Sequence, residues 1–206
     1  MRDQSISAFL EQLAARVPAP GGGASGALHA AQAAALLAMV GRYSDGPAYD
    51  PHRALVDDVV AGADRVRDRA LRLAEEDAAA FGAVADAYRL PKSTDAEKSA
   101  RSAAIAAALR GAAEPPADTV AVAAELAGLA ERLLPVGNRN VLSDVGAAAE
   151  SLRAAAGVAR INIEVNLGGI KDESVRGPLL EAVRTAGEVM VRADAVSAAV
   201  REEITR

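Results

Sequence analysis

Along most of this chain, apolar side chains recur every three or four residues, which is the spacing of a helix that buries one face. The clearest case is the stretch from residue 51 to 90, where Val59, Val66, Ala70 and Leu73 are separated by charged residues. Proline and glycine breaks divide the rest of the chain. The pattern predicts seven helices, at about residues 5–16, 24–43, 51–90, 95–114, 115–134, 140–167 and 171–204.

Three local features sharpen these boundaries. Thr94 and Glu97 have the spacing of a capping box, which predicts that a helix starts at Asp95. The pair Pro115–Pro116 predicts the first turn of a separate helix, because proline is tolerated there. Residues 161–167 alternate like a strand, but the sequence offers no partner strand, so we expect them to be helical. The sequence thus predicts an all-α bundle of about seven helices, with one or two long helices and no sheet.

The composition predicts a closely packed helical core and limits the kinds of side chain that could act in catalysis. The 206 residues suit one domain, 1–206, and alanine makes up about a quarter of them. With three tyrosines, two phenylalanines and no tryptophan, the helices must pack closely, and a thin core favours further burial in an oligomer. The absence of cysteine excludes disulfides and thiolate metal sites, and two histidines disfavour a His-rich site. Catalysis would therefore rest on carboxylates, amides, hydroxyls or cations, and no metal is expected.

Charge and hydropathy argue against two classes of partner. The formal net charge is −5 and both signs are interspersed, so the sequence has no basic stripe for a nucleic acid. The longest apolar run, residues 30–40, is too short to cross a bilayer, and the N-terminus lacks the pattern of a cleaved signal. We therefore expect a cytoplasmic protein that binds neither nucleic acid nor a membrane.

A break in the helical pattern at Pro18–Gly23 is the first candidate for a ligand site. Its last three residues are glycines, and a helix of small residues follows directly. Free amides at a helix N-terminus bind anionic or polar groups, and glycines let a ligand come close to them. A tight turn between two helices is the simpler explanation of the same residues.

Two further polar features are candidates. Residues 137–144 hold two amides, a hydroxyl, a guanidinium and a carboxylate, and Asn162 and Asn166 share one helical face. A helix cap and a pair of structural amides are the simpler interpretations. On a continuous helix Asp144 and Asn162 lie about 27 Å apart along the axis. Either they belong to different sites, or a second, antiparallel subunit brings them together.

Taken together, these features resemble the cyclodeaminase/cyclohydrolase family, which includes the C-terminal domain of formiminotransferase-cyclodeaminase and stand-alone methenyltetrahydrofolate cyclohydrolases. The resemblance spans nearly the whole chain and rests on residues 18–25, 90–94 with Glu97 and Arg101, 138–144 and 162–167. It implies an all-helical fold that assembles as a homodimer or a higher homo-oligomer. It also implies a folate substrate bound between helices near a subunit interface, with no cofactor beyond tetrahydrofolate.

The resemblance also implies a reaction and the residues that perform it. The expected activity is hydrolysis of methenyltetrahydrofolate to 10-formyltetrahydrofolate by carboxylate acid/base catalysis, with Asp144 as the acid/base residue. The alternatives are release of ammonia from formiminotetrahydrofolate, and non-catalytic binding of a folate or another metabolite. Arg139 and Arg160 stand where smaller residues are usual in that family. The expected substrate-binding residues are Gly21, Gly22, Gly23, Ser25, Lys92, Asn138, Asn140, Ser143, Asn162 and Asn166.

Overall fold

A computed structural model describes residues 2–206, which form six α-helices, two short 3-10 helices and no strand. The all-α prediction is confirmed, and residues 161–167, which alternate like a strand, are helical. The α-helices are α1 (Ile6–Ala14), α2 (Gly22–Tyr43), α3 (Arg53–Arg89), α4 (Asp95–Leu133), α5 (Leu142–Leu167) and α6 (Glu173–Ile204), and the 3-10 helices are η1 (Pro47–His52) and η2 (Arg139–Val141).

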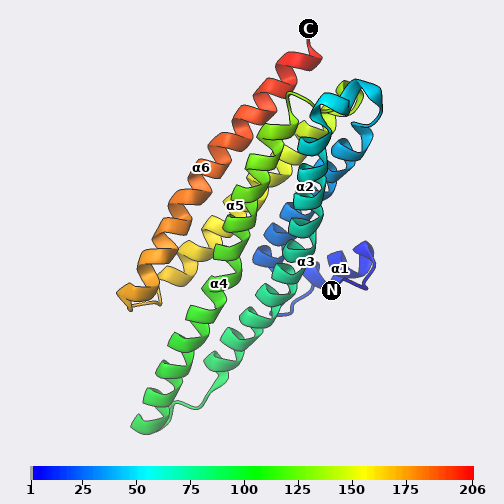
Figure 1. Ribbon diagram of the computed structural model, residues 1–206. Coiled ribbons are helices and arrows are strands. Elements are labelled where there is room, and N and C mark those ends of the chain that lie inside the picture. The colour runs from blue at the N-terminus through cyan, green and yellow to red at the C-terminus, as the bar shows by residue number, and fades with distance from the viewer. Residues whose placement is uncertain (1) are drawn as a thin grey trace.

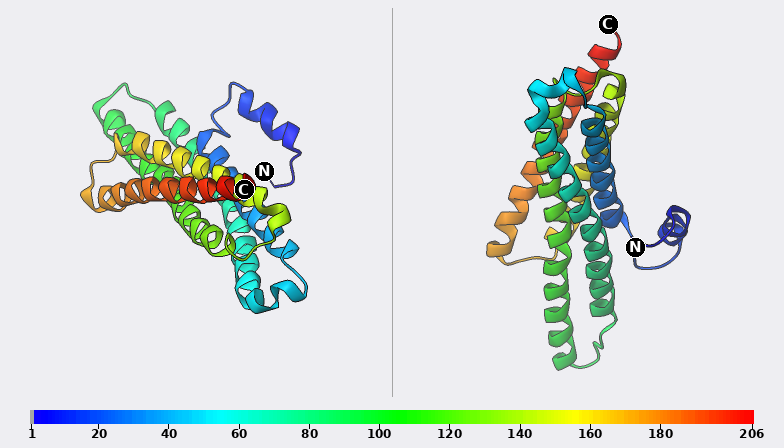
Figure 2. Two further views of the ribbon diagram at one scale, coloured as in Figure 1. Left: turned by 90° about the horizontal axis from the view of Figure 1, so that it is seen from above. Right: turned by 45° about the vertical axis from the view of Figure 1, so that its right-hand side comes forward.

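The helices from α2 to α6 form an antiparallel bundle, in which α2, α4 and α6 point one way and α3 and α5 the other (Figure 1). Helix α2 packs against both α3 and α5. The hairpin of α3 and α4 extends beyond the other helices at the end opposite the C-terminus (Figure 1). Helix α1 stands apart from the bundle (Figure 2), and none of its residues is buried.

Glycines on α2 allow its close contact with both neighbouring helices. A Cβ on Gly41 would lie 2.5 Å from Val60 Cγ2 of α3, and a Cβ on Gly26 would lie 2.8 Å from Val158 Cγ1 of α5. Carbon atoms pack no closer than about 3.5 Å without repulsion, so any larger residue at these two positions would push the helices apart.

As a whole, α2 is more apolar than the run 30–40 suggests. By length and composition alone it meets the requirement for a helix that crosses a membrane. However, 61% of its most apolar window is buried inside the bundle. A helix that is apolar on nearly every side and covered by other helices is a core helix.

The predicted count of seven helices is wrong by one, because residues 95–133 form a single helix. Helix α4 continues through Pro115 and Pro116, although a proline costs about 3 kcal/mol in a helix interior. Both prolines are buried, and Thr119 Oγ1 donates a hydrogen bond of 2.8 Å to the Pro115 carbonyl oxygen. Tertiary packing therefore overrides the local preference for a break.

The predicted capping box at the start of α4 is confirmed. The backbone N–H of Glu97 donates to Thr94 Oγ1 at 3.2 Å, and the backbone N–H of Thr94 donates to Glu97 Oε2 at 2.9 Å. Helix α4 begins at Asp95, as the sequence predicts. These two bonds satisfy amides that would otherwise lack a partner at the helix end.

Candidate functional site

Four helices contribute to a small cavity beside the N-terminus of α2. Its volume is about 130 Å³, and its walls come from the glycine break, the second half of α3, the middle of α4 and the last turns of α5. Two motifs that are far apart in the sequence, the break at 18–23 and the pair Asn162 and Asn166, therefore meet here. The lining residues are Pro18, Gly21, Gly22, Gly23, Asp77, Phe81, Ala112, Asn162 and Asn166.

The carboxyl group of this cavity belongs to Asp77, a residue that no sequence motif marks. Asp77 follows the buried residues Leu73 and Ala74 by one helical turn, so it lies on the apolar face of α3. Burial raises the pKa of Asp77, and the backbone N–H of Ala24 opposes that shift. A carboxylate on the apolar face of an amphipathic helix is the sequence signal that could have identified it.

Asp77 lies against the first turn of α2. Gly21, the N-cap residue, has no side chain to bind the free amides of that turn. The Asp77 side chain, which belongs to α3, binds there instead, because its carboxyl interacts with the Ala24 N–H. Gly23 is necessary for the contact, since a Cβ there would lie 2.0 Å from Asp77 Oδ1. The cavity thus places a carboxyl group beside helix N-terminal donors.

Two amides of α5 complete the polar wall. Asn162 Nδ2 donates to the Val158 carbonyl oxygen at 2.9 Å. Asn166 Nδ2 donates to the carbonyl oxygens of Ala112 at 3.1 Å and Asn162 at 3.0 Å. Neither Oδ1 atom accepts a hydrogen bond from any residue between 2 and 206. These oxygens therefore remain available as acceptors for a ligand.

The second polar motif lies at the other end of α2. Asn138 donates from Nδ2 to the Tyr43 carbonyl oxygen at 2.6 Å and from its backbone N–H to Ser44 Oγ at 2.8 Å. Because α2 has 22 residues, its two ends are about 33 Å apart. The predicted site residues that follow Asn138 also lie outside the lining of the small cavity: Asn140, Ser143 and Asp144.

The three cations that the sequence draws attention to, Lys92, Arg139 and Arg160, lie outside the small cavity too. Lys92 is exposed in the connection between α3 and α4, at the tip of the hairpin (Figure 1). Arg139 Nη1 pairs with Glu203 Oε2 at 2.9 Å, and Arg160 Nε pairs with Glu164 Oε1 at 2.8 Å. The two arginines are thus bound to surface carboxylates of the same chain.

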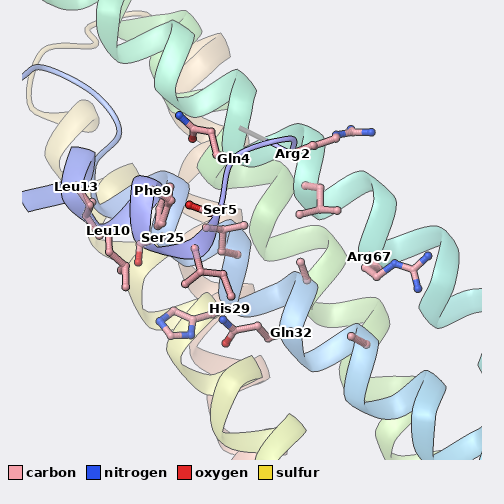
Figure 3. Close-up of a pocket in the computed structure, with 15 residues that line it drawn as sticks. Arg2, Gln4, Ser5, Phe9, Leu10, Leu13, Ser25, His29, Gln32 and Arg67 are labelled. Carbon is pink, nitrogen blue, oxygen red and sulfur yellow. The ribbon is translucent and has the colours of Figure 1, made fainter.

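A larger cavity of about 500 Å³ lies between α1 and the helices α2 and α3 (Figure 3). Most of its wall is apolar, and α2 contributes the polar side chains of Ser25, His29 and Gln32. Ser25, a predicted substrate-binding residue, therefore lines this cavity instead of the small one. Leu71 in its wall and Asp77 in the small cavity are about 9 Å apart along the axis of α3, so the two cavities are neighbours.

The small cavity is suited to proton transfer. A carboxyl group with a raised pKa exchanges protons closer to neutral pH than an ordinary aspartate. Backbone amides at a helix N-terminus stabilise negative charge that develops on an oxygen. Within the described part of the chain, no three His, Cys, Asp or Glu side chains are grouped so that they could hold a metal ion.

Known proteins match this chain over most of its length. The sequence model of the formiminotransferase-cyclodeaminase family matches residues 5–199. A methenyltetrahydrofolate cyclohydrolase of Methylorubrum extorquens is 38% identical, over 84% of this chain and 83% of that protein. The formimidoyltransferase-cyclodeaminase of Rattus norvegicus is 33% identical over 83% of this chain but only 32% of its own length.

The fold also matches a solved structure. The crystal structure of a formiminotetrahydrofolate cyclodeaminase from Thermotoga maritima has a TM-score of 0.82 to this chain at 30% identity. The match covers 98% of this chain and 96% of the other. The arrangement of the helices is therefore shared almost from end to end.

A substitution that adds a methyl group at position 23 tests the contact between Gly23 and Asp77. We expect Gly23→Ala to lower the free energy of unfolding by about 1–3 kcal/mol, because the methyl group must displace the Asp77 carboxyl. Gly22→Ala is the matched control, since its methyl group meets nothing nearer than Asn162 Nδ2 at 3.8 Å. Urea unfolding measures both variants. Equal stabilities would show that Asp77 does not lie against Gly23.

The raised pKa of Asp77 predicts a pH dependence. The folded protein holds this proton more tightly than the unfolded chain, where the pKa of aspartate is about 3.9. The resulting stabilisation is complete below that pH and is lost as the pH rises through the folded-state pKa. We therefore expect the free energy of unfolding of the wild type, relative to Asp77→Asn, to fall as the pH rises from about 4 through the folded-state pKa. A constant or rising difference would contradict a raised pKa.

Proposed function

Because this chain belongs to the formiminotransferase-cyclodeaminase family, we propose that it hydrolyses methenyltetrahydrofolate to 10-formyltetrahydrofolate. The observation that carries this proposal is the small cavity in which Asp77 meets the first turn of α2. The similarity to the Methylorubrum extorquens cyclohydrolase extends over most of both proteins and favours this reaction. The substrate is a small molecule of the folate class.

Hydrolysis of methenyltetrahydrofolate requires few catalytic groups from the protein. Its methenyl carbon lies between two nitrogens in a cationic amidinium group and is already electrophilic. A base must take one proton from water as the C–O bond forms, and an acid must protonate the departing nitrogen as the C–N bond breaks. Loss of the hydroxyl proton then gives the formyl group, so that one proton is released overall. The proposed reaction uses no cofactor beyond the tetrahydrofolate itself.

We assign the two proton transfers to Asp77. Its raised pKa makes the carboxyl a better proton donor to the departing nitrogen than an ordinary aspartate at neutral pH. The amides of Gly22 and Gly23, at the positive end of α2, would stabilise charge on the attacking oxygen. Asp144 is the carboxylate that the resemblance suggests, but it lies in the first turn of α5 and outside this cavity.

The two cavities would divide the substrate between them. A volume of about 130 Å³ is smaller than the roughly 300–1,000 Å³ of a usual ligand pocket. The small cavity would therefore hold only the one-carbon bridge and the atoms next to it. The neighbouring cavity of about 500 Å³, with Ser25 and His29 in its wall, has room for more of the folate.

Cyclodeamination of formiminotetrahydrofolate is the second candidate, supported by the match to the Thermotoga maritima structure. In that reaction a substrate nitrogen attacks the formimino carbon and ammonia leaves. The departing nitrogen again needs a proton, which Asp77 would supply. Measuring ammonia release from formiminotetrahydrofolate separates this activity from hydrolysis.

We expect Asp77→Asn to lower kcat for methenyltetrahydrofolate hydrolysis by about 10²–10⁴-fold, the usual contribution of a general acid or base. The loss of methenyl absorbance above the buffer rate measures the activity, and Asp144→Asn is the comparison variant. A larger loss in Asp144→Asn than in Asp77→Asn would return the acid/base role to Asp144. A wild type that only matches the buffer rate with both substrates would leave folate or metabolite binding as the function.

We also propose that the chain forms a homodimer or a higher homo-oligomer. Ile161 and Val165 flank Asn162 on α5 and are 60% and 73% exposed, which leaves an apolar surface uncovered beside the cavity. An antiparallel second copy on this surface would bring its Asp144 towards Asn162. Sedimentation at micromolar concentration is expected to show a dimer or larger species, and a monomer would overturn this pairing.

A further inference from the structure

Helix α4 contains two backbone carbonyls that lose their helical partners. A proline has no N–H to donate to the carbonyl four residues earlier, so Pro115 leaves Gly111 O and Pro116 leaves Ala112 O without the regular hydrogen bond. Ala112 is buried and lines the small cavity. A buried carbonyl without a donor destabilises a fold, so a replacement is needed at Ala112.

The side chain of Asn166 supplies this replacement from α5. Its Nδ2 atom lies 3.1 Å from Ala112 O and 3.0 Å from Asn162 O. An amide nitrogen has two hydrogens, so the backbone of α4 and α5 occupies both donors of Asn166. Gly111 is only half-buried, and its carbonyl receives no side-chain donor within residues 2–206.

The side chain of Asn166 keeps one polar atom without a partner once both of its N–H groups are bonded. This atom is the oxygen Oδ1, which is a hydrogen-bond acceptor. Asn162 differs, because its Nδ2 donates only to the Val158 carbonyl oxygen and so keeps one N–H as well as its Oδ1. Both side chains line the cavity together with Asp77. At the Asn166 position the wall therefore accepts hydrogen bonds but has no amide donor to offer.

We infer that Pro116 and Asn166 form a functional pair that sets the hydrogen-bonding polarity of the small cavity at Asn166. Pro116 frees the Ala112 carbonyl, the amide nitrogen of Asn166 donates to that carbonyl and to the Asn162 carbonyl, and the amide oxygen is left for the ligand. The ligand group that binds against Asn166 must then carry N–H donors, as the ring nitrogens and amino group of a reduced pterin do. This ligand class rests on the proposed function, whereas the pairing of the two residues does not.

A double-mutant cycle tests the pairing without any ligand. Asn166→Ala is made in the wild type, in Pro116→Ala and, as the matched control, in Pro115→Ala. In Pro116→Ala the backbone N–H gained at position 116 donates to Ala112 O, so we expect the loss of urea midpoint caused by Asn166→Ala to be at least halved. In Pro115→Ala only Gly111 O gains a donor, so the full loss should remain. Equal losses in the two proline backgrounds would overturn the pairing.

Kinetics test the acceptor role of Asn166. With methenyltetrahydrofolate, we expect Asn166→Ala to raise KM several-fold while kcat changes less, because Asp77 is untouched. The double variant Pro116→Ala/Asn166→Ala should recover much of the stability but keep the raised KM, since the amide oxygen is still missing. A KM that recovers together with stability would show that Asn166 is only structural.

The urea cycle and the kinetic assay distinguish failure of the pairing from failure of the proposed function. If the wild type turns over no folate, the proposed function fails, but the urea cycle still measures the pairing of Pro116 with Asn166. If turnover is present and the cycle shows no coupling, the pairing fails and the proposed function stands.

Discussion

The close contact of α2 with α3 and α5 is the constraint on which the rest of the structure depends. A core this rich in alanine buries little apolar area per residue, so stability requires the helices to approach until their backbones and short side chains touch. Gly26 and Gly41 permit this approach to α5 and α3. Gly23 extends the same geometry to the first turn of α2, where the neighbouring atoms are those of the Asp77 carboxyl. The packing that forms the core thus also forms the candidate site.

Two opposing electrostatic effects act on that carboxyl. Burial disfavours the ionised form, whereas the Ala24 N–H and the positive end of α2 favour it. The raised pKa shows that burial is the larger effect. A carboxyl group balanced in this way can both accept and donate a proton, which the addition of water to a cationic carbon requires. An exposed aspartate at a helix N-terminus would remain ionised and could act only as a base.

Polar side chains in this alanine-rich bundle hold helices together as well as facing cavities. Asn138 ties the start of α5 to the end of α2, and both of its amide atoms bind protein partners. Asn166 ties α5 to α4 through one amide atom and leaves the other available. Asn138 and Asn166 have the same side chain, so this difference in free atoms comes from the groups that surround each residue. A polar residue in a sequence motif is therefore a site residue only where the fold leaves one of its atoms without a partner.

The sequence by itself determined the helical class, most helix ends and two of the motifs that meet at the small cavity. Hydrophobic spacing, the capping box at Thr94 and the glycine break are local properties of the chain, so they can be recognised without the fold. Tertiary structure alone decided that α4 continues through its prolines, because buried packing outweighs a local break. It also decided that Asp77 lies beside the glycine break while residues 138–144 lie about 33 Å away along α2. Which polar groups share a cavity depends on contacts between helices, and the order of residues along the chain does not contain those distances.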